Sequence, residues 1–172
     1  MSRHIGGTAH GGAPDIETDA DLERAFRTAL AQWASGVTVV SVRDEPHVFG
    51  ITVTAFASVS LDPPLVLVCL GGNAVVLPIL DVGKQLVVNI LGAAQQRTAA
   101  IFTDVGPLGR ELFPPAGPPV IAGSPASLIC TVDALHPAGD HTVVIARVQR
   151  VVLGGGGQPP LLRHDRAWRS LA

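Results

Sequence analysis

The stretch from Gly50 to Leu70 constrains the fold more than any other part of this chain, because two apolar runs meet there at a tight break. The break is Asp62-Pro63-Pro64, where the prolines have no backbone N–H to donate. Ile51 to Leu61 precede it, and Leu65 to Leu70 follow it. Short apolar runs bounded by turn signals are typical of strands. We therefore expect a strand on each side of the break, with the second buried on both faces.

The first run has a regular pattern of small hydroxyl side chains. The even positions hold Thr52, Thr54, Ser58 and Ser60. The odd positions hold Ile51, Val53, Ala55, Ala57 and Val59. Because side chains alternate along a strand, this pattern predicts one strand with an apolar face and a hydroxyl face. Small residues let a flat ligand approach the backbone, and hydroxyls can bond its polar rim. The alternative is that Thr and Ser simply suit a half-buried strand.

The composition limits the class of protein. A length of 172 residues favours one domain, and 47% hydrophobic against 15% charged residues predicts a sparsely charged surface and an oligomer. A net charge of −2 gives no reason to expect nucleic acid. No apolar stretch reaches the roughly 18 residues of a membrane span, and no signal peptide is recognisable, which predicts a cytoplasmic protein without membrane contact. Cys69 and Cys130 lie inside apolar runs, so we expect buried free thiols.

The N-terminal region divides into a tail and a helix. Residues 1–18 are rich in Gly, His and Ala and predict a disordered tail, so that the folded domain covers 19–172. Residues 18–34 have a helical period, with Thr18 or Asp19 as the cap. The apolar stripe of this helix is Leu22, Ala25, Phe26, Ala29, Leu30 and Trp33. We expect the stripe to pack on a sheet.

The rest of the chain reads as six or seven strands and two or three helices, joined by hairpins more than by helical crossovers. This order predicts a mainly β fold with flanking helices (α+β), built on a mostly antiparallel closed sheet.

Five separated motifs resemble the flavin reductase-like family, the small partners of two-component flavin monooxygenases. Residues 50–69 match nearly all of the family pattern G-x-T-x-x-S-F-x-S-V-S-L-D-P-P-L-V-L-V-C. The other matches are G-V-T-V-V at 36–40, V-N-I-L at 88–91, P-V-I-x-G at 119–123 and P-A-G-D-H-T at 137–142. The resemblance extends from about residue 26 to 171. It implies a dimeric, antiparallel split β-barrel of the Greek-key type, with flavin at the subunit boundary.

The resemblance also implies a set of site residues. Those expected to contact the flavin ring and ribityl chain are Thr52, Val53, Thr54, Ala55, Ser58 and Ser60. Asn73 is the polar residue kept in a loop near the flavin phosphate. His141 would lie beside the nicotinamide; the alternative is a turn in which Asp140 caps its own backbone. Arg163 and His164 would bind the nicotinamide nucleotide, although a solvated strand edge explains them equally well.

These features lead to three hypotheses. The first is an NAD(P)H:flavin oxidoreductase that uses NADH or NADPH to reduce FMN or FAD and supplies the reduced flavin to a partner monooxygenase. Hydride transfer between these cofactors needs no protein nucleophile, which agrees with the lack of a recognisable catalytic motif. The second is a flavin- or small-ligand-binding barrel without reductase turnover, because Gly72, Val76 and Ile101 stand near positions where the family carries charge. The third is a purely structural partner subunit.

Overall fold

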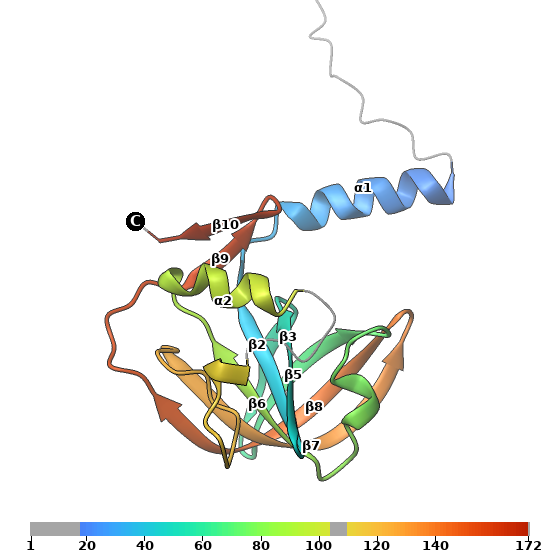
Figure 1. Ribbon diagram of the computed structural model, residues 1–172. Helices are drawn as coiled ribbons and strands as arrows, with labels where there is room; N and C mark the ends of the chain where they lie inside the picture. Colours follow the sequence, from blue (N-terminus) through green and yellow to red (C-terminus); the bar gives the residue numbers. More distant parts are fainter. Residues whose placement is uncertain (1–17, 104–109, 172) are drawn as a thin grey trace, which may run out of the picture. The chain divides into compact units, whose positions relative to one another are not determined.

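The computed structural model describes residues 18–103 and 110–171, so the tail predicted at residues 1–18 lies, except for Thr18, outside the described residues. Residues 1–33 and 34–172 form two units, and each is described by itself (Figure 1). A search of the described residues finds no helix with the length and apolar character needed to cross a membrane.

Helix α1, Asp19–Ala31, belongs to the first unit. Thr18 is its N-cap, as predicted, and its hydroxyl accepts a hydrogen bond from the N–H of Asp21. No residue of this helix is buried, and Phe26 is 59% exposed. The packing of the apolar stripe on a sheet stays a prediction. Amphipathic spacing determines which face is apolar, but it does not determine what covers that face.

The second unit is built on a seven-stranded sheet with the order β3-β2-β6-β7-β8-β5-β4 (Figure 1). All its neighbouring strands pair antiparallel, which confirms the prediction of a mainly antiparallel β fold with few helices. The strands are β2 (Thr38–Asp44), β3 (His47–Val53), β4 (Phe56–Leu61), β5 (Pro64–Gly71), β6 (Gln85–Ile90), β7 (Ala126–Ala138) and β8 (His141–Leu153).

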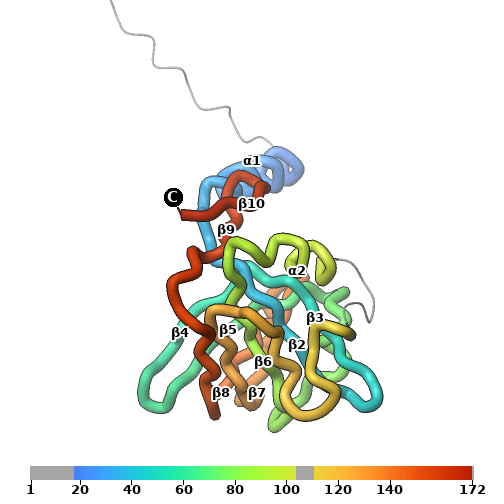
Figure 2. The backbone as a smooth tube through the Cα atoms, turned by 60° about the vertical axis from the view of Figure 1, so that its left-hand side comes forward, coloured from blue at the N-terminus to red at the C-terminus, as the bar shows by residue number. Residues whose placement is uncertain are grey.

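A smaller sheet and short helices complete this unit. The three-stranded sheet has the order β1-β9-β10, with β1 at Ser35–Gly36, β9 at Leu161–His164 and β10 at Ala167–Ser170 (Figure 2). Helix α2 spans Gln96–Ile101. The 3₁₀ helices are η1 (Leu77–Ile79), η2 (Ala93–Gln95) and η3 (Arg110–Leu112).

The two edge strands of the large sheet, β3 and β4, are consecutive in the chain and are separated only by Thr54 and Ala55. Three Cα–Cα steps hold the ends of these edges within about 11 Å, so the sheet must curl at this point. The N–H of Cys69 on β5 also donates to the carbonyl of Ala55. The prediction of one continuous strand from Ile51 to Leu61 is therefore wrong.

The change of partner explains the break. β3 pairs with β2, whereas β4 pairs with β5 at the opposite edge of the sheet. The four hydroxyl residues consequently lie on two strands and their link, and they do not form one hydroxyl face. A β-bulge between Ser58 and Ser60 further interrupts the alternation on β4.

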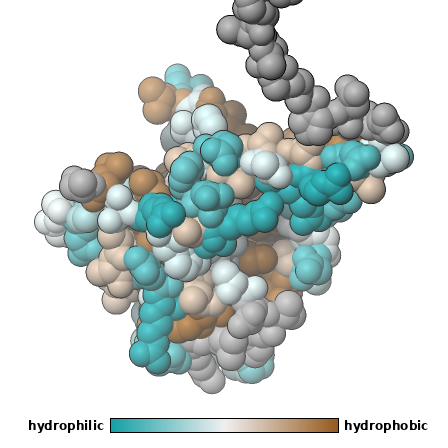
Figure 3. Space-filling view, turned by 90° about the horizontal axis from the view of Figure 1, so that it is seen from above, coloured by the Kyte–Doolittle hydropathy of each residue, from teal (hydrophilic) through white to brown (hydrophobic). Residues whose placement is uncertain are grey.

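Two apolar clusters form the core. The larger one lies inside the curled sheet and includes Val68 and Leu70 from β5. The smaller one includes Phe102, which follows α2, and Leu161 of β9. The prediction that β5 is buried on both faces is wrong, because Leu67 and Cys69 on its outer face are only half-buried. Apolar residues also reach the surface elsewhere (Figure 3).

The buried side chain of Asn89 on β6 connects the sheet to the loop after η3. Its amide nitrogen donates to the carbonyl of Val39 and to the hydroxyl of Ser41. Its amide oxygen accepts from the N–H of Ile121 and from the hydroxyl of Ser127. Every polar atom of this side chain is thus paired, as a buried amide requires.

Candidate functional site

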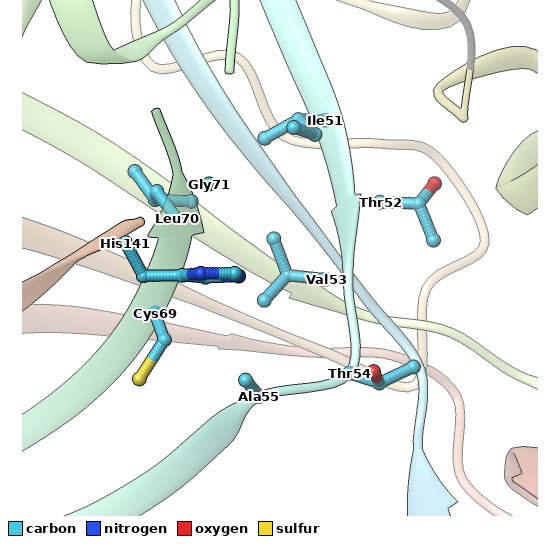
Figure 4. A pocket seen from close by; sticks show the side chains of 9 residues that line it. All are labelled: Ile51, Thr52, Val53, Thr54, Ala55, Cys69, Leu70, Gly71 and His141. Carbon is cyan, nitrogen blue, oxygen red and sulfur yellow. The ribbon is translucent and has the colours of Figure 1, made fainter. Parts of the chain in front are cut away.

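A cavity of about 190 Å³ lies where β3 ends beside the end of β5 and the start of β8 (Figure 4). Its lining residues come from three segments of the chain, and they are Ile51, Thr52, Val53, Thr54, Ala55, Cys69, Leu70, Gly71 and His141. The curl of the sheet brings these segments together, because β3 and β5 are far apart in the order of strands across the sheet.

Glycine leaves one wall of the cavity without a side chain. Gly71, the last residue of β5, pairs in register with His141, the first residue of β8. A Cβ atom on Gly71 would lie 3.2 Å from Oδ1 of Asn73 and 3.8 Å from Nε2 of His141. A larger side chain here would therefore occupy the space beside the imidazole, whereas glycine leaves the backbone open to a ligand.

His141 is held by the two-residue turn between β7 and β8. Gly139 has a φ of +62°, which glycine adopts without steric cost, and Asp140 follows it. Nδ1 of His141 lies 2.7 Å from Oδ1 of Asp140. The N–H of Gly72 donates to the carbonyl oxygen of Asp140 over 2.9 Å. These contacts orient the imidazole beside the cavity.

Five of the predicted site residues meet at this cavity: Thr52, Val53, Thr54, Ala55 and His141. The hydroxyl of Thr52 is committed elsewhere, because it donates to the carbonyl of Ala99 in α2 over 2.7 Å. Its N–H donates to the carbonyl of Phe102 over 2.9 Å. Thr52 therefore anchors the cavity wall to α2, and Thr54 is the exposed hydroxyl at this wall.

The other predicted residues do not line the cavity. Ser58 and Ser60 lie on β4, beyond the link. Asn73 is exposed and sits next to the glycine wall. Arg163 and His164 lie on β9 in the smaller sheet. The guanidinium of Arg163 lies 4.5 Å from the ring centre of Trp168, a cation–π contact.

The sequence interpretation missed the contribution of β5 to the site. Cys69 was expected to be fully buried, but it is half-buried and lines the cavity beside Leu70 and Gly71. The available signal was its place two residues before Gly71, which puts both on one face of the strand. Cys130 is fully buried as expected, and burial raises the pKa of its thiol to about 12.

The comparison with protein families assigns the chain. The model described as "Flavin reductase like domain" matches residues 30–172. The chain belongs to the flavin reductase-like family. This assignment confirms the resemblance that the sequence motifs indicated.

Curated relatives and solved structures agree with the family. The reductase component of 4-hydroxyphenylacetate 3-monooxygenase from Thermus thermophilus is 38% identical over 150 residues, which are 87% of this chain and 97% of that protein. The NADH-dependent FAD reductase of Streptomyces globisporus is 38% identical, over 79% of this chain and 80% of that one. The structure of the Streptomyces globisporus NADH:FAD oxidoreductase SgcE6 has a TM-score of 0.80 at 31% identity, with 92% and 98% of the two chains covered. Another structure of SgcE6 contains NAD and FAD fragments.

Proposed function

We propose that this protein is an NAD(P)H:flavin oxidoreductase, which transfers a hydride from NADH or NADPH to FMN or FAD and supplies the reduced flavin to a partner monooxygenase. The observation that carries the proposal is the cavity at residues 51–55, where the segment that matches the family's flavin motif meets His141 of the G-D-H motif. Relatives named as NADH-dependent reductases of FMN and of FAD support the same chemistry.

The residues at the cavity fit a flat aromatic ligand. A bound flavin supplies the ring that accepts the hydride, so the protein needs no nucleophile of its own. Ala55 and the bare backbone of Gly71 allow close approach, and the hydroxyl of Thr54 and the imidazole of His141 are its polar groups. Among the lining residues, only His141 and Cys69 ionise at all, so the wall presents little charge to a neutral ring. The chain's task is to orient two rings, which can contribute about 7–11 kcal/mol in favourable cases.

One chain provides only part of such a site. The cavity of about 190 Å³ is smaller than the roughly 300–1,000 Å³ of pockets that enclose a whole ligand. The outer face of the sheet continues from the cavity across β5 and β8. On this face Cys69 pairs in register with Val143, and Leu67 pairs with Ile145. All four side chains are half-buried in the single chain. We propose that a second copy covers this apolar face and completes the flavin site in a homodimer.

The curl at Thr54 and Ala55 supports the finer description of the fold as a split barrel. The sheet edges meet at that end, because two residues connect them, while β3 and β4 pair with different strands along their lengths. We further propose a cytoplasmic location, which suits a user of nicotinamide nucleotides with two free cysteines.

Steady-state assays test the proposed activity. Purified protein is mixed with NADH or NADPH and with FMN or FAD, and nicotinamide oxidation is followed by absorbance. The proposal requires a rate well above that of free flavin with the nucleotide alone. Tight flavin binding without turnover would favour the ligand-binding barrel instead, and neither binding nor turnover would contradict both readings.

A further inference from the structure

The segment that follows η3 is too rich in proline to pair as a strand. Residues 114–119 read Pro-Pro-Ala-Gly-Pro-Pro, and we call them the proline strap. Four of these six residues have no backbone N–H, so the ladder bonds of a sheet cannot hold the strap in place. Its carbonyl oxygens remain as acceptors, and donors from other parts of the fold have to satisfy them.

One arginine side chain supplies donors to three of these carbonyls. Nη2 of Arg43 on β2 donates to the carbonyl of Pro114 over 2.6 Å. Its Nε donates to the carbonyl of Gly117 over 2.8 Å, and its Nη1 donates to that of Pro115 over 3.4 Å. The side chain of Arg43 is 15% exposed, and its ion pair with the exposed Glu45 is long, at 3.7 Å. Because a buried guanidinium needs partners for its donors, Arg43 and the strap hold each other in place.

The residue before the strap connects it to the wall of the cavity. Phe113 directly precedes Pro114, and its ring packs against that of Phe102 at a centroid distance of 5.6 Å. The carbonyl of Phe102 accepts a hydrogen bond from the N–H of Thr52, which lines the cavity. Both rings are buried in the smaller core cluster, where close packing transmits a shift of one ring to the other. A series of direct contacts therefore links Arg43 to the cavity.

We propose that Arg43 is a positioning residue of the flavin site, which holds the cavity wall at Thr52 in place through the proline strap, Phe113 and Phe102. This inference rests on the proposed function, since it concerns how the wall of the proposed flavin site is supported. A lysine at this position keeps the positive charge, but its single ammonium cannot span three carbonyls as a planar guanidinium does. Arg43→Lys consequently loosens the strap without removing the charge.

The first measurement reads the last contact of this series without any ligand. Hydrogen exchange is followed by NMR on the full chain. We expect the N–H of Thr52 to exchange about 10-fold faster in Arg43→Lys, because its acceptor on Phe102 is less firmly held. Amides of β6, a strand paired on both sides, should exchange as in the wild type. A general loss of stability would instead accelerate both sets alike.

Lys84→Met is the matched control for this measurement. Lys84 is a neighbouring cation whose Nζ pairs with the carboxylate of Asp44, the residue after Arg43, over 2.9 Å. The substitution removes this ion pair entirely, whereas the donors to the strap stay in place. We expect the exchange of the Thr52 N–H to be unchanged in Lys84→Met.

The second measurement reads the effect on the ligand. FMN binding is titrated by flavin fluorescence for Arg43→Lys, Phe113→Leu and the double variant. We expect each single substitution to weaken FMN binding by about 3- to 10-fold. The double variant should bind no more weakly than the weaker single variant, because both substitutions interrupt the same series of contacts. Lys84→Met should bind FMN like the wild type.

The outcomes separate this inference from the proposed function. Unchanged exchange at Thr52 in Arg43→Lys, or acceleration in step with β6, overturns the positioning role even if the protein reduces flavin well. Faster exchange with unchanged FMN affinity, or additive losses in the double variant, overturns the link to the flavin site. A protein that neither binds nor reduces flavin contradicts the proposed function, and the exchange of Thr52 still reports whether Arg43 supports the wall.

Discussion

The two thiols of this chain have the same chemistry in sequence but different environments in the structure. Cys69 lines the cavity and is half-buried, whereas Cys130 on β7 is fully buried in the larger core cluster. The thiolate is the reactive form of cysteine. Because burial raises the pKa of Cys130 to about 12, its thiolate is scarce near neutral pH.

Thiol labelling checks this difference. We expect iodoacetamide at pH 8 to modify Cys69 and to leave Cys130 unmodified, since a pKa of about 12 leaves only about one thiolate in ten thousand. NAD⁺ or FMN should slow the labelling of Cys69 by occupying the cavity. Mass spectrometry identifies the modified residue, and Cys69→Ser is the control that should lose the label. Rapid modification of Cys130 in the folded protein would contradict the expectation.

The raised pKa of Cys130 also predicts a pH dependence of stability. Between the ordinary thiol pKa of 9.0 and about 12, the unfolded chain releases the Cys130 proton and the folded chain retains it. The unfolded state is favoured by this release, so the free energy of unfolding falls as pH rises through this window. Urea unfolding at pH 8 to 10.5 should show a steeper decrease for the wild type than for Cys130→Ala. If the free energy of unfolding fell equally with pH in both proteins, the raised pKa of Cys130 would be refuted.

At the scale of elements, β3 packs against the end of α2 through a glycine. A Cβ atom on Gly50 would lie 2.7 Å from two ring carbons of Phe102, which is itself only 1% exposed. The Phe102 ring also packs against Phe113 at a centroid distance of 5.6 Å, so it has little room to move. This close approach allows Thr52 to donate hydrogen bonds to the carbonyls of Ala99 in α2 and of Phe102 just after it.

Substitution of this glycine tests the packing. We expect Gly50→Ala to lower the free energy of unfolding by about 1–3 kcal/mol, the usual cost of overpacking a core. The control is Gly36→Ala on β1, where a Cβ atom would meet nothing within 4 Å. Urea denaturation measures both variants. Equal stability of the two would show that Phe102 moves aside freely.

The turn between β9 and β10 stores backbone strain. Both of its central residues have positive φ, +47° for Asp165 and +56° for Arg166, as in a type I′ hairpin turn. Asp tolerates this region through its short polar side chain, but a long side chain such as Arg does not. We expect Arg166→Gly to raise the free energy of unfolding by about 0.5–1 kcal/mol and Asp165→Gly to raise it less. Thermal unfolding compares them, and a destabilised Arg166→Gly would indicate that the Arg166 side chain makes a needed contact.

At the scale of the whole molecule, the proposed homodimer makes the flavin site depend on the apolar outer face of β5 and β8. A charge placed on this face should prevent a second copy from covering it, since an unpaired buried charge is costly. By analytical ultracentrifugation we expect the wild type to be a dimer and Leu67→Asp to be a monomer. We also expect Leu67→Asp to bind flavin at least about 10-fold more weakly, which is a loss of about 1.4 kcal/mol in binding free energy. Val82→Asp, at a residue 69% exposed, should remain dimeric. A monomeric wild type that binds flavin tightly would refute the shared site.

The local signals in the sequence determined much of the fold. The Asp62-Pro63-Pro64 break, the hairpin spacing and the Thr18 cap identified the antiparallel strands and the first helix, because turns, caps and alternation depend on neighbouring residues. The ordered motifs also identified the family, which spans residues 30–172. Five of the ten proposed site residues followed from those motifs and do meet at the cavity.

Tertiary structure alone decided which neighbouring strand each segment pairs with. The alternation from Ile51 to Leu61 has the same period whether the chain continues as one strand or changes partner at Thr54, so the sequence pattern could not show the break between β3 and β4. The role of Gly71 beside His141 and the commitment of the Thr52 hydroxyl to Ala99 likewise depend on segments far apart in the chain. Local sequence specifies propensity and period, whereas the site arises from long-range strand pairing and from the curl of the sheet, which bring the ends of β3 and β5 and the start of β8 together.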